Sequence, residues 1–208
     1  MNKYSAFNGL NTAEKAELIE QINAKEKLYE KGRRIFTLTS ESDETGILIQ
    51  GLAYLVSINN YGEENILEYY SPGNIFGSYF SPDTNVNLYA ITAKKDCNIL
   101  VFKNTNIVSN VNSVNKYHIK FINNVITSAS RKSQIHIDIL SQRTIRKKLL
   151  TYLSYLSENE GTRTLTLPIP LSDLADYICV DRSAMMREIR KMNNESIITS
   201  KGKVISIL

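Results

Sequence analysis

The stretch from Leu171 to Met192 constrains the fold of this chain most, because its spacing predicts two short helices around a tight turn. The first helix is expected to begin near Ser172 or Asp173. Asp181 follows the turn and is placed to cap the second helix, by accepting a hydrogen bond from a backbone N–H near Ala184. The pattern therefore predicts a helix-turn-helix.

The second of these helices separates apolar from basic residues. Met185, Ile189 and Met192 recur at intervals of four and three, which predicts a buried stripe. The residues left pointing outward are Arg182, Ser183, Met186, Arg187 and Arg190. Arginines at the beginning and along one face of such a helix are the arrangement by which a recognition helix addresses base edges in the major groove of DNA. A merely solvated helix face is the alternative interpretation of these charges.

A predicted β-hairpin follows the second helix. Residues 196–199 and 204–207 are short β-rich runs, and the turn between them carries Lys201 and Lys203. Lysines at a hairpin tip are placed to reach a phosphate. Together with the two helices, the hairpin predicts a winged helix-turn-helix.

Charge is divided unevenly along the chain. Residues 1–34 carry 7 basic and 5 acidic side chains, residues 35–93 carry no Lys or Arg and 7 acids, and residues 94–208 carry 18 basic and 9 acidic side chains. These parts sum to the net charge of +4. We interpret the division as two domains with different partners.

The part of the chain from Arg33 to Lys103 is typical of an antiparallel β-structure. Its short β-rich runs, separated by turn residues, are 33–39, 46–59, 65–70, 75–80, 88–93 and 98–102. Many short strands at close spacing predict a small barrel or jelly roll. Before it, the composition of residues Thr12 to Lys31 predicts one helix, with Leu18, Ile22 and Leu28 among its apolar residues and Gly32 as its stop.

A long helix is predicted after the β-rich part. Its apolar stripe, at intervals of three and four, comprises Val111, Val114, His118, Phe121, Val125, Ser128, Lys132, Ile135 and Ile139. A seam this narrow suits a partner helix, which makes Val114, His118, Phe121 and Val125 the expected dimer interface. Packing of the stripe on its own barrel is the alternative. The predicted domains are a β-barrel with an N-terminal helix (1–105), a dimerisation helix and hinge (106–140), and a winged helix-turn-helix (141–208).

Three motifs resemble one known family. Residues 174–178 (Leu-Ala-Asp-Tyr-Ile), 180–184 (Val-Asp-Arg-Ser-Ala) and 201–203 (Lys-Gly-Lys) are similar to the DNA-binding domain of the Crp/Fnr superfamily of bacterial transcription regulators. Residues 72–77 (Pro-Gly-Asn-Ile-Phe-Gly) resemble the Pro-Gly-Asp-x-Phe-Gly turn of that family's cyclic-nucleotide-binding barrel. The resemblance covers nearly the whole chain in order.

The resemblance implies roles for individual residues. Arg182, Ser183 and Arg187 match base-contacting positions, and Arg190 lies on the same predicted helix face. The positions that match the neighbourhoods of backbone contacts are Ser172, Lys201 and Lys203. Cys179 stands where the family's turn usually has Gly, and we expect it to be a small buried residue. A hinge near residues 140–144 is also implied.

The expected effector pocket departs from that of members that bind cyclic AMP. Its implied residues are Phe76, Gly77, Ser78, Tyr79, Leu88 and Tyr89. Ser78 stands where such members have a Glu for the ribose, and residues 87–89 occupy the region of their phosphate-binding Arg. The loss of a charged hydrogen bond typically costs about 1.5 to 3 kcal/mol. We therefore expect that neither cyclic AMP nor cyclic GMP binds usefully, and no cofactor is predicted.

Metal and enzyme chemistry find little support in the sequence. Cys97 and Cys179 form no Cys-x-x-Cys pair, and the only histidines, His118 and His136, lie 18 residues apart, about 27 Å along a helix. Two copies of His118 could face each other across a dimer seam, but a packing role is the simpler reading. No nucleophile motif or glycine-rich phosphate loop is present. No metal site is predicted, and the chain is not expected to be an enzyme.

These observations predict an α+β chain that acts as a sequence-specific DNA-binding transcription regulator. The expected partners are double-stranded DNA at a near-palindromic operator and a second copy of the chain, and RNA polymerase is a further candidate. No apolar run approaches the roughly 20 residues of a membrane span, and the N-terminus lacks a secretion signal, so a cytoplasmic location is expected. The rival hypothesis is an oligomerisation protein whose winged helix binds another protein.

Overall fold

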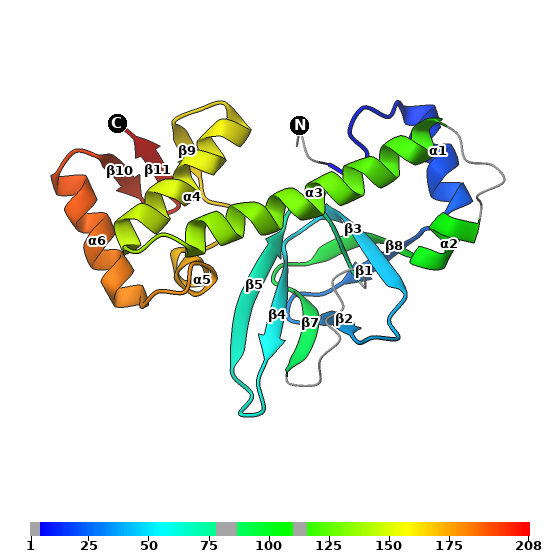
Figure 1. Ribbon diagram of the computed structural model, residues 1–208, viewed down its shortest axis with the longest axis horizontal. Helices are drawn as coiled ribbons and strands as arrows, with labels where there is room; N and C mark the ends of the chain where they lie inside the picture. The colour runs from blue at the N-terminus through cyan, green and yellow to red at the C-terminus, as the bar shows by residue number, and fades with distance from the viewer. Residues whose placement is uncertain (1–4, 78–86, 110–115) are drawn as a thin grey trace. The chain divides into compact units, whose positions relative to one another are not determined.

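The computed structural model describes residues 5–77, 87–109 and 116–208. The chain divides into two compact units, Met1–Ala129 and Ser130–Leu208 (Figure 1). Of the residues singled out in the sequence, Ser78, Tyr79, Val111 and Val114 lie outside the described ranges.

Two antiparallel four-stranded sheets form most of the first unit. Their strands are β1 (Lys25–Tyr29), β2 (Arg34–Leu38), β3 (Glu44–Gln50), β4 (Ala53–Ile58), β5 (Glu64–Tyr70), β6 (Ile75–Gly77), β7 (Leu88–Ala93) and β8 (Cys97–Lys103). One sheet has the order β1-β8-β3-β6 and the other the order β2-β7-β4-β5. The predicted jelly-roll-like domain is therefore confirmed.

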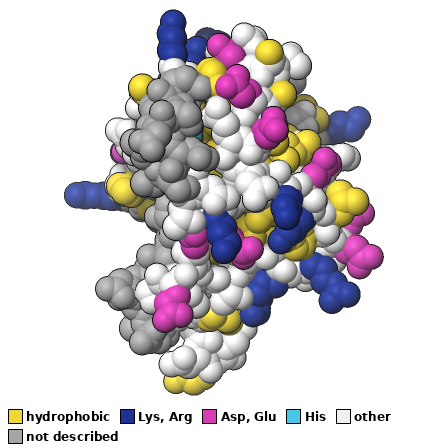
Figure 2. Space-filling model, turned by 90° about the vertical axis from the view of Figure 1, so that its right-hand side faces the viewer, with side chains coloured by type: hydrophobic (Ala, Val, Ile, Leu, Met, Phe, Trp, Pro, Cys, Tyr) yellow, Lys and Arg dark blue, Asp and Glu magenta, His cyan; other side chains and the backbone are white. Residues whose placement is uncertain are grey.

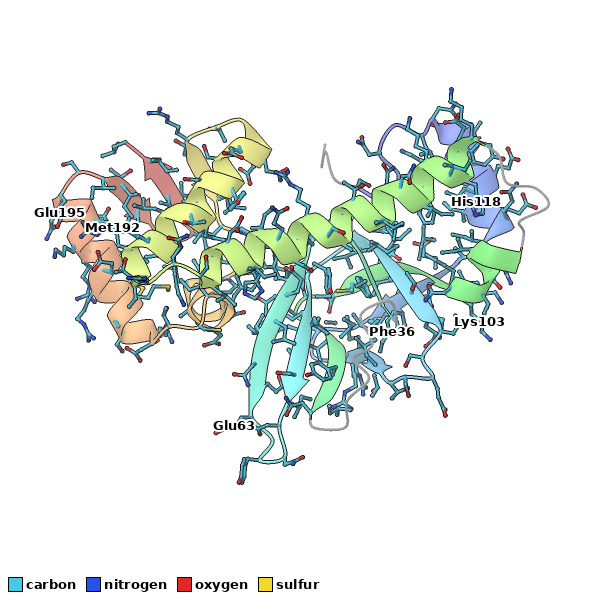
Figure 3. All side chains as sticks on the ribbon, in the orientation of Figure 1. Phe36, Glu63, Lys103, His118, Met192 and Glu195 are labelled. Atoms are coloured by element: carbon cyan, nitrogen blue, oxygen red, sulfur yellow. The ribbon has the colours of Figure 1, made fainter. Side chains whose placement is uncertain are left out.

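Aromatic residues occupy the core of this unit. The ring of Phe76 lies 5.8 Å from that of Phe36 and 5.1 Å from that of Tyr70, measured between centroids. All three side chains are buried in one apolar cluster with residues of both sheets. Figure 3 shows Phe36 within the strand-built part of the chain. Burial of several aromatic side chains supplies a large share of the apolar stabilisation of a small domain.

Two sequence predictions in this unit are wrong. The helix predicted over Thr12 to Lys31 is α1 (Thr12–Gln21) alone, and residues 25–29 form β1, which pairs with β8. Pairing with a neighbouring strand overrides the helical composition of Lys25–Tyr29 and leaves Leu28 79% exposed. The single run predicted over 46–59 is two strands, because Gly51 turns the chain with φ 109°.

Helices cover one side of the first unit. Asn11 caps α1 through a capping box with Glu14. Leu18 and Ile22 are fully buried in a second apolar cluster, which also contains Phe121 of the long helix α3 (Lys116–Leu140). A shorter helix, α2 (Asn104–Ser109), follows β8 directly.

The second unit contains the end of α3, three further helices and a small sheet. These elements are α4 (Ile145–Glu160), β9 (Thr164–Thr166), α5 (Leu171–Tyr177), α6 (Arg182–Asn194), β10 (Ile198–Lys201) and β11 (Val204–Ile207). The sheet is antiparallel, with the order β10-β11-β9. This is the winged helix-turn-helix predicted from the sequence, so the α+β fold class is confirmed. Within the described ranges, no helix has the length and apolar character that crossing a membrane requires.

Candidate nucleic-acid interface

The helix α6 separates a buried stripe from an exposed basic face, as its sequence predicts. Asp181 accepts a hydrogen bond from the backbone N–H of Ala184 at 2.7 Å, which caps the helix N-terminus. Met185, Ile189 and Met192 are buried against the rest of the unit. The residues on the exposed side are Arg182, Ser183, Arg187 and Arg190. Since helical neighbours lie about 100° apart, these four residues share one half of the helix surface.

The wing presents two further cations. Lys201 ends β10 and Lys203 lies just before β11, and both side chains are exposed. Gly202 between them has φ 61°, a conformation that favours glycine in a tight hairpin. Asn193 joins the end of α6 to this wing, because its side chain accepts from Ser200 N at 2.8 Å and donates to Ser200 Oγ at 2.8 Å.

Two residues of the helix-turn-helix differ from expectation. Ser172 is partly buried, and its hydroxyl donates to Asp173 Oδ1 at 2.8 Å, so this group already has an acceptor within the unit. Cys179 is exposed, not buried as the sequence interpretation expected. It has φ 52°, in the left-handed region, which explains why a glycine suits this turn in the resembling family.

The expected dimer residues on α3 are turned inward. Phe121 is 0% and His118 1% exposed, and His118 Nε2 lies 3.1 Å from the carbonyl oxygen of Ile107. Phe121 stacks with Phe7 at 5.8 Å between centroids, and Val125 packs against the same cluster. Figure 3 shows His118 at the N-terminal end of α3. The interface assigned to these three residues is therefore corrected: the stripe packs on its own unit, which was the alternative interpretation.

A second apolar stripe on α3 is exposed, and sequence reasoning missed it. Ile119 is 51%, Ile126 59% and Ile137 65% exposed. The residues that share this side of the helix are Ile119, Ile126, Ala129, Ser133, Ile137 and Leu140. Ile122 lies between them but is partly buried against the cluster of Phe121. The stripe recurs at intervals of three, four and seven, the heptad spacing of helices that pair side by side. The same spacing is present in the sequence, next to the stripe that was predicted to form the dimer interface.

The end of α3 is bound into the second unit. The hydroxyl of Tyr155 donates to Asp138 Oδ2 at 2.5 Å, and this hydrogen bond raises the pKa of Tyr155. Gln142 Nε2 donates to the carbonyl oxygen of Asp138 at 3.1 Å, and Thr144 caps α4 by accepting from the N–H of Lys147. The segment proposed as a hinge, residues 140–144, is thus held by hydrogen bonds on both sides.

The implied effector residues do not gather into one site among the described residues. Phe76 belongs to the aromatic core, and Tyr89 packs against that core from β7. Leu88 precedes Tyr89 in the same strand and is 39% exposed, so it faces the opposite side of the sheet. Gly77 has φ 147°, and a Cβ there would lie 2.5 Å from the carbonyl oxygen of Glu44, so β6 and β3 approach too closely for any other residue. Leu88 therefore does not line the interior of the barrel, contrary to the sequence prediction.

On one other face of the molecule, charged side chains of both signs are mixed. On the face drawn in Figure 2, Lys and Arg side chains alternate with Asp and Glu side chains among the residues described. Within the same described ranges, no group of three His, Cys, Asp or Glu side chains is arranged to hold a metal ion. The basic residues assigned from the sequence are those on the exposed side of α6 and in the wing.

Comparison with known proteins agrees with this arrangement. A family model described as the cyclic nucleotide-binding domain matches residues 26–111. The nitrogen fixation regulation protein FixK of Rhizobium meliloti (strain 1021) is 22% identical over 182 residues, which cover 86% of this chain and 81% of FixK.

Solved structures share the fold. FixK2 from Bradyrhizobium japonicum aligns with a TM-score of 0.69 and 18% identity, covering 88% of this chain and 92% of that one. A cyclic nucleotide-binding domain containing protein from Listeria monocytogenes EGD-e aligns with a TM-score of 0.73 and 16% identity, covering 93% and 97%. The fold shared with these structures is a cyclic-nucleotide-binding-like barrel joined to a winged helix. The predicted resemblance to the Crp/Fnr superfamily is confirmed.

Proposed function

We propose that the chain is a sequence-specific DNA-binding transcription regulator of the Crp/Fnr type, which works as a homodimer on a near-palindromic operator. The observation that carries the proposal is the surface of α6, where Arg182, Arg187 and Arg190 are exposed while the apolar stripe of the same helix is buried. Arginine forms bidentate hydrogen bonds with guanine, which is the commonest base-specific contact in the major groove. Residues placed this way have no role in packing the unit, so their arrangement favours recognition of a ligand.

The proposal gives each basic residue a role. Arg182, Ser183 and Arg187 contact base edges, with Arg190 further along the same helix face. Lys201 and Lys203 contact phosphates from the wing, and these contacts set affinity and register without reading sequence. Ser172 contacts the DNA backbone only if its hydroxyl donates to a phosphate oxygen instead of to Asp173.

The homodimer forms through the exposed stripe of α3 that includes Ile119, Ile126 and Ile137. Large apolar side chains at heptad spacing bury well against an identical helix and poorly against water. A two-fold pair of recognition helices about 34 Å apart enters successive major grooves of a near-palindromic site. The dimer interface therefore differs in its residues from the one predicted from the sequence, while the expected partner is the same.

The remaining roles follow from this proposal. The chain acts in the cytoplasm, with RNA polymerase as a further partner at regulated promoters, and no enzymatic reaction is assigned to it. The barrel takes an effector other than a cyclic nucleotide or takes none. The relatives' regulatory function and the shared fold support this class of function.

The test is a measurement of DNA binding by fluorescence anisotropy. A duplex selected from a random library by the full chain is compared with a scrambled duplex of equal length, at several salt concentrations. The proposal predicts tight binding to the selected duplex, at least about 1,000-fold tighter than to the scrambled one, with affinity that falls steeply with salt. Equal binding to both, or no binding to either, would favour the protein-binding alternative for the winged helix.

A further inference from the structure

One arginine joins the recognition helix to the helix before it. Arg146 lies in the first turn of α4, and its Nε donates to Glu188 Oε1 at 2.5 Å. Its Nη1 and Nη2 donate to the two carboxylate oxygens of Glu195, at 2.6 and 3.2 Å. Glu188 lies within α6 and Glu195 is its C-cap residue. A single guanidinium therefore contacts the recognition helix at two points.

The two glutamates lie seven residues apart, about two helical turns, so they share one side of α6. A planar guanidinium that binds carboxylates with several N–H groups at once fixes their direction as well as their distance. Two such anchors on one side of a helix oppose its rotation about its own axis. Figure 3 shows Glu195 near Met192 at the C-terminal end of α6, where the buried stripe also ends.

The network is only partly buried, which limits what it adds to stability. The exposed fraction of the side chain is 29% for Arg146, 23% for Glu188 and 37% for Glu195. Ion pairs this exposed contribute little to the free energy of folding, since water screens them. The hydrogen bonds that Glu195 and Glu188 accept raise the pKa of Arg146, and the hydrogen bonds that Arg146 donates lower the pKa of Glu195. Arg146 and Glu195 are therefore charged and paired at neutral pH.

A second contact holds the helix from the wing. Asn193 binds Ser200 of β10 with two hydrogen bonds and donates to the carbonyl oxygen of Ile189 at 2.8 Å. The recognition helix is thus attached to α4 through Arg146 and to the wing through Asn193. Arg182 and Arg187 project from a helix whose orientation is set before any DNA arrives.

We propose that Arg146 is a positioning residue for DNA recognition: through Glu188 and Glu195 it holds α6 in the orientation in which its arginines reach base edges, and it does not itself contact DNA. The inference rests on the proposed function. Preorganisation of this kind increases affinity for the correct sequence, because α6 is already ordered in the free protein and loses little conformational entropy on binding. Binding to arbitrary sequence needs only phosphate contacts and is much less sensitive to the orientation of the helix.

The test compares Arg146→Met, Arg146→Lys and the double variant Glu188→Gln with Glu195→Gln. Arg163→Met is the matched control, because Arg163 is an exposed arginine of the same unit that enters no ion pair of the described chain. Binding to the selected and scrambled duplexes is measured by anisotropy over a range of salt concentrations, below the melting temperature of every variant. The double glutamine variant removes the anchors while Arg146 stays in place.

The expected result is a loss of about tenfold in affinity for the selected duplex in Arg146→Met, comparable to a weakened base contact, with unchanged binding to the scrambled duplex. The double glutamine variant reproduces the loss, Arg146→Lys recovers part of the affinity, and Arg163→Met does not change the ratio between the duplexes. The dependence of affinity on salt keeps its slope in all four proteins.

Other outcomes overturn the proposal. A salt slope that falls by about one in Arg146→Met, with normal binding by the double glutamine variant, would make Arg146 a direct phosphate contact. An equal loss on both duplexes would show a general loss of structure. If the unaltered chain itself fails to distinguish the duplexes, the proposed function fails, and that result is visible before any variant is compared.

Discussion

The imidazole ring of His136 lies flat on the phenol ring of Tyr177, with 4.1 Å between the centroids and 9° between the planes. His136 Nε2 also lies 2.7 Å from the carbonyl oxygen of Tyr177. His136 belongs to the end of α3, and Tyr177 is the last residue of α5, the first helix of the helix-turn-helix. This pair fastens α5 to α3 within the second unit.

Replacing His136 with Ala removes both the stacking and the hydrogen bond. We expect the free energy that protects α5 from local opening to fall by about 1 to 2 kcal/mol. Hydrogen exchange of the α5 amides, followed by mass spectrometry, measures this directly as faster exchange. Gln134→Ala, an exposed position on the same helix, is the control, and equal exchange in both variants would contradict a fastening role for His136.

Replacing Ile126 with Glu tests the dimer stripe. Ile126 is exposed in the single chain, so a charge there leaves the fold intact but cannot be buried against a second copy. Sedimentation should show a dimer for the unaltered chain and a monomer for Ile126→Glu, with an unchanged far-UV circular dichroism spectrum. Thr127→Glu, at the next exposed position but off the stripe, should remain dimeric. A dimer that survives Ile126→Glu would place the interface elsewhere.

Acid should weaken the contact between α4 and α6. Arg146 lowers the pKa of Glu195 in the folded chain, whereas the unfolded chain has an ordinary Glu pKa of about 4.3. The contribution of Glu195 to stability is therefore present above that ordinary value and is lost as the pH falls through the lowered folded pKa. The free energy of unfolding, measured with urea at a series of pH values, should be higher for the unaltered chain than for Glu195→Gln. This difference should shrink towards low pH. A difference in the free energy of unfolding that stays constant over the whole pH range would be inconsistent with this ion pair.

Cyclic nucleotides should not bind the barrel with useful affinity. Residues 35–93 contain no Lys or Arg but seven acidic residues, of which Glu68 of β5 is buried. A cyclic phosphate placed among these residues meets repulsion without a guanidinium to offset it. Isothermal titration of the full chain with cyclic AMP and with cyclic GMP should give no binding heat at micromolar concentrations. Micromolar affinity for either nucleotide would refute this expectation.

Much of the fold was predictable because local patterns and tertiary structure agree. In α6, the cap at Asp181, the apolar stripe and the basic face all indicate the same helix, and the structure contains it. The prediction for residues 25–29 is wrong because their Lys and Glu content is typical of a helix, while their partner strand β8 lies more than 60 residues away in sequence. Sequence patterns register neighbours within one element and miss such distant pairing.

The same limit explains the site residues that were missed. Arg146 is separated from Glu188 by 42 residues and from Glu195 by 49, so no spacing rule connects them. On α3 two stripes compete, and composition alone does not say which one faces the barrel. The apolar cluster that Phe121 joins shows that the stripe of His118 and Phe121 packs on the first unit. Ile119 and Ile126 are left exposed.

The central claim is that α6 reads bases while the wing holds the backbone. The most direct measurement is the affinity of Arg182→Ala and Lys201→Ala for a panel of operators that differ from the selected duplex by single base pairs. Arg182→Ala should lose about 1 to 3 kcal/mol on the selected duplex and lose its preference at one base pair. Lys201→Ala should weaken every duplex about equally and reduce the salt slope by about one. Equal effects of the two substitutions on every operator would contradict the account.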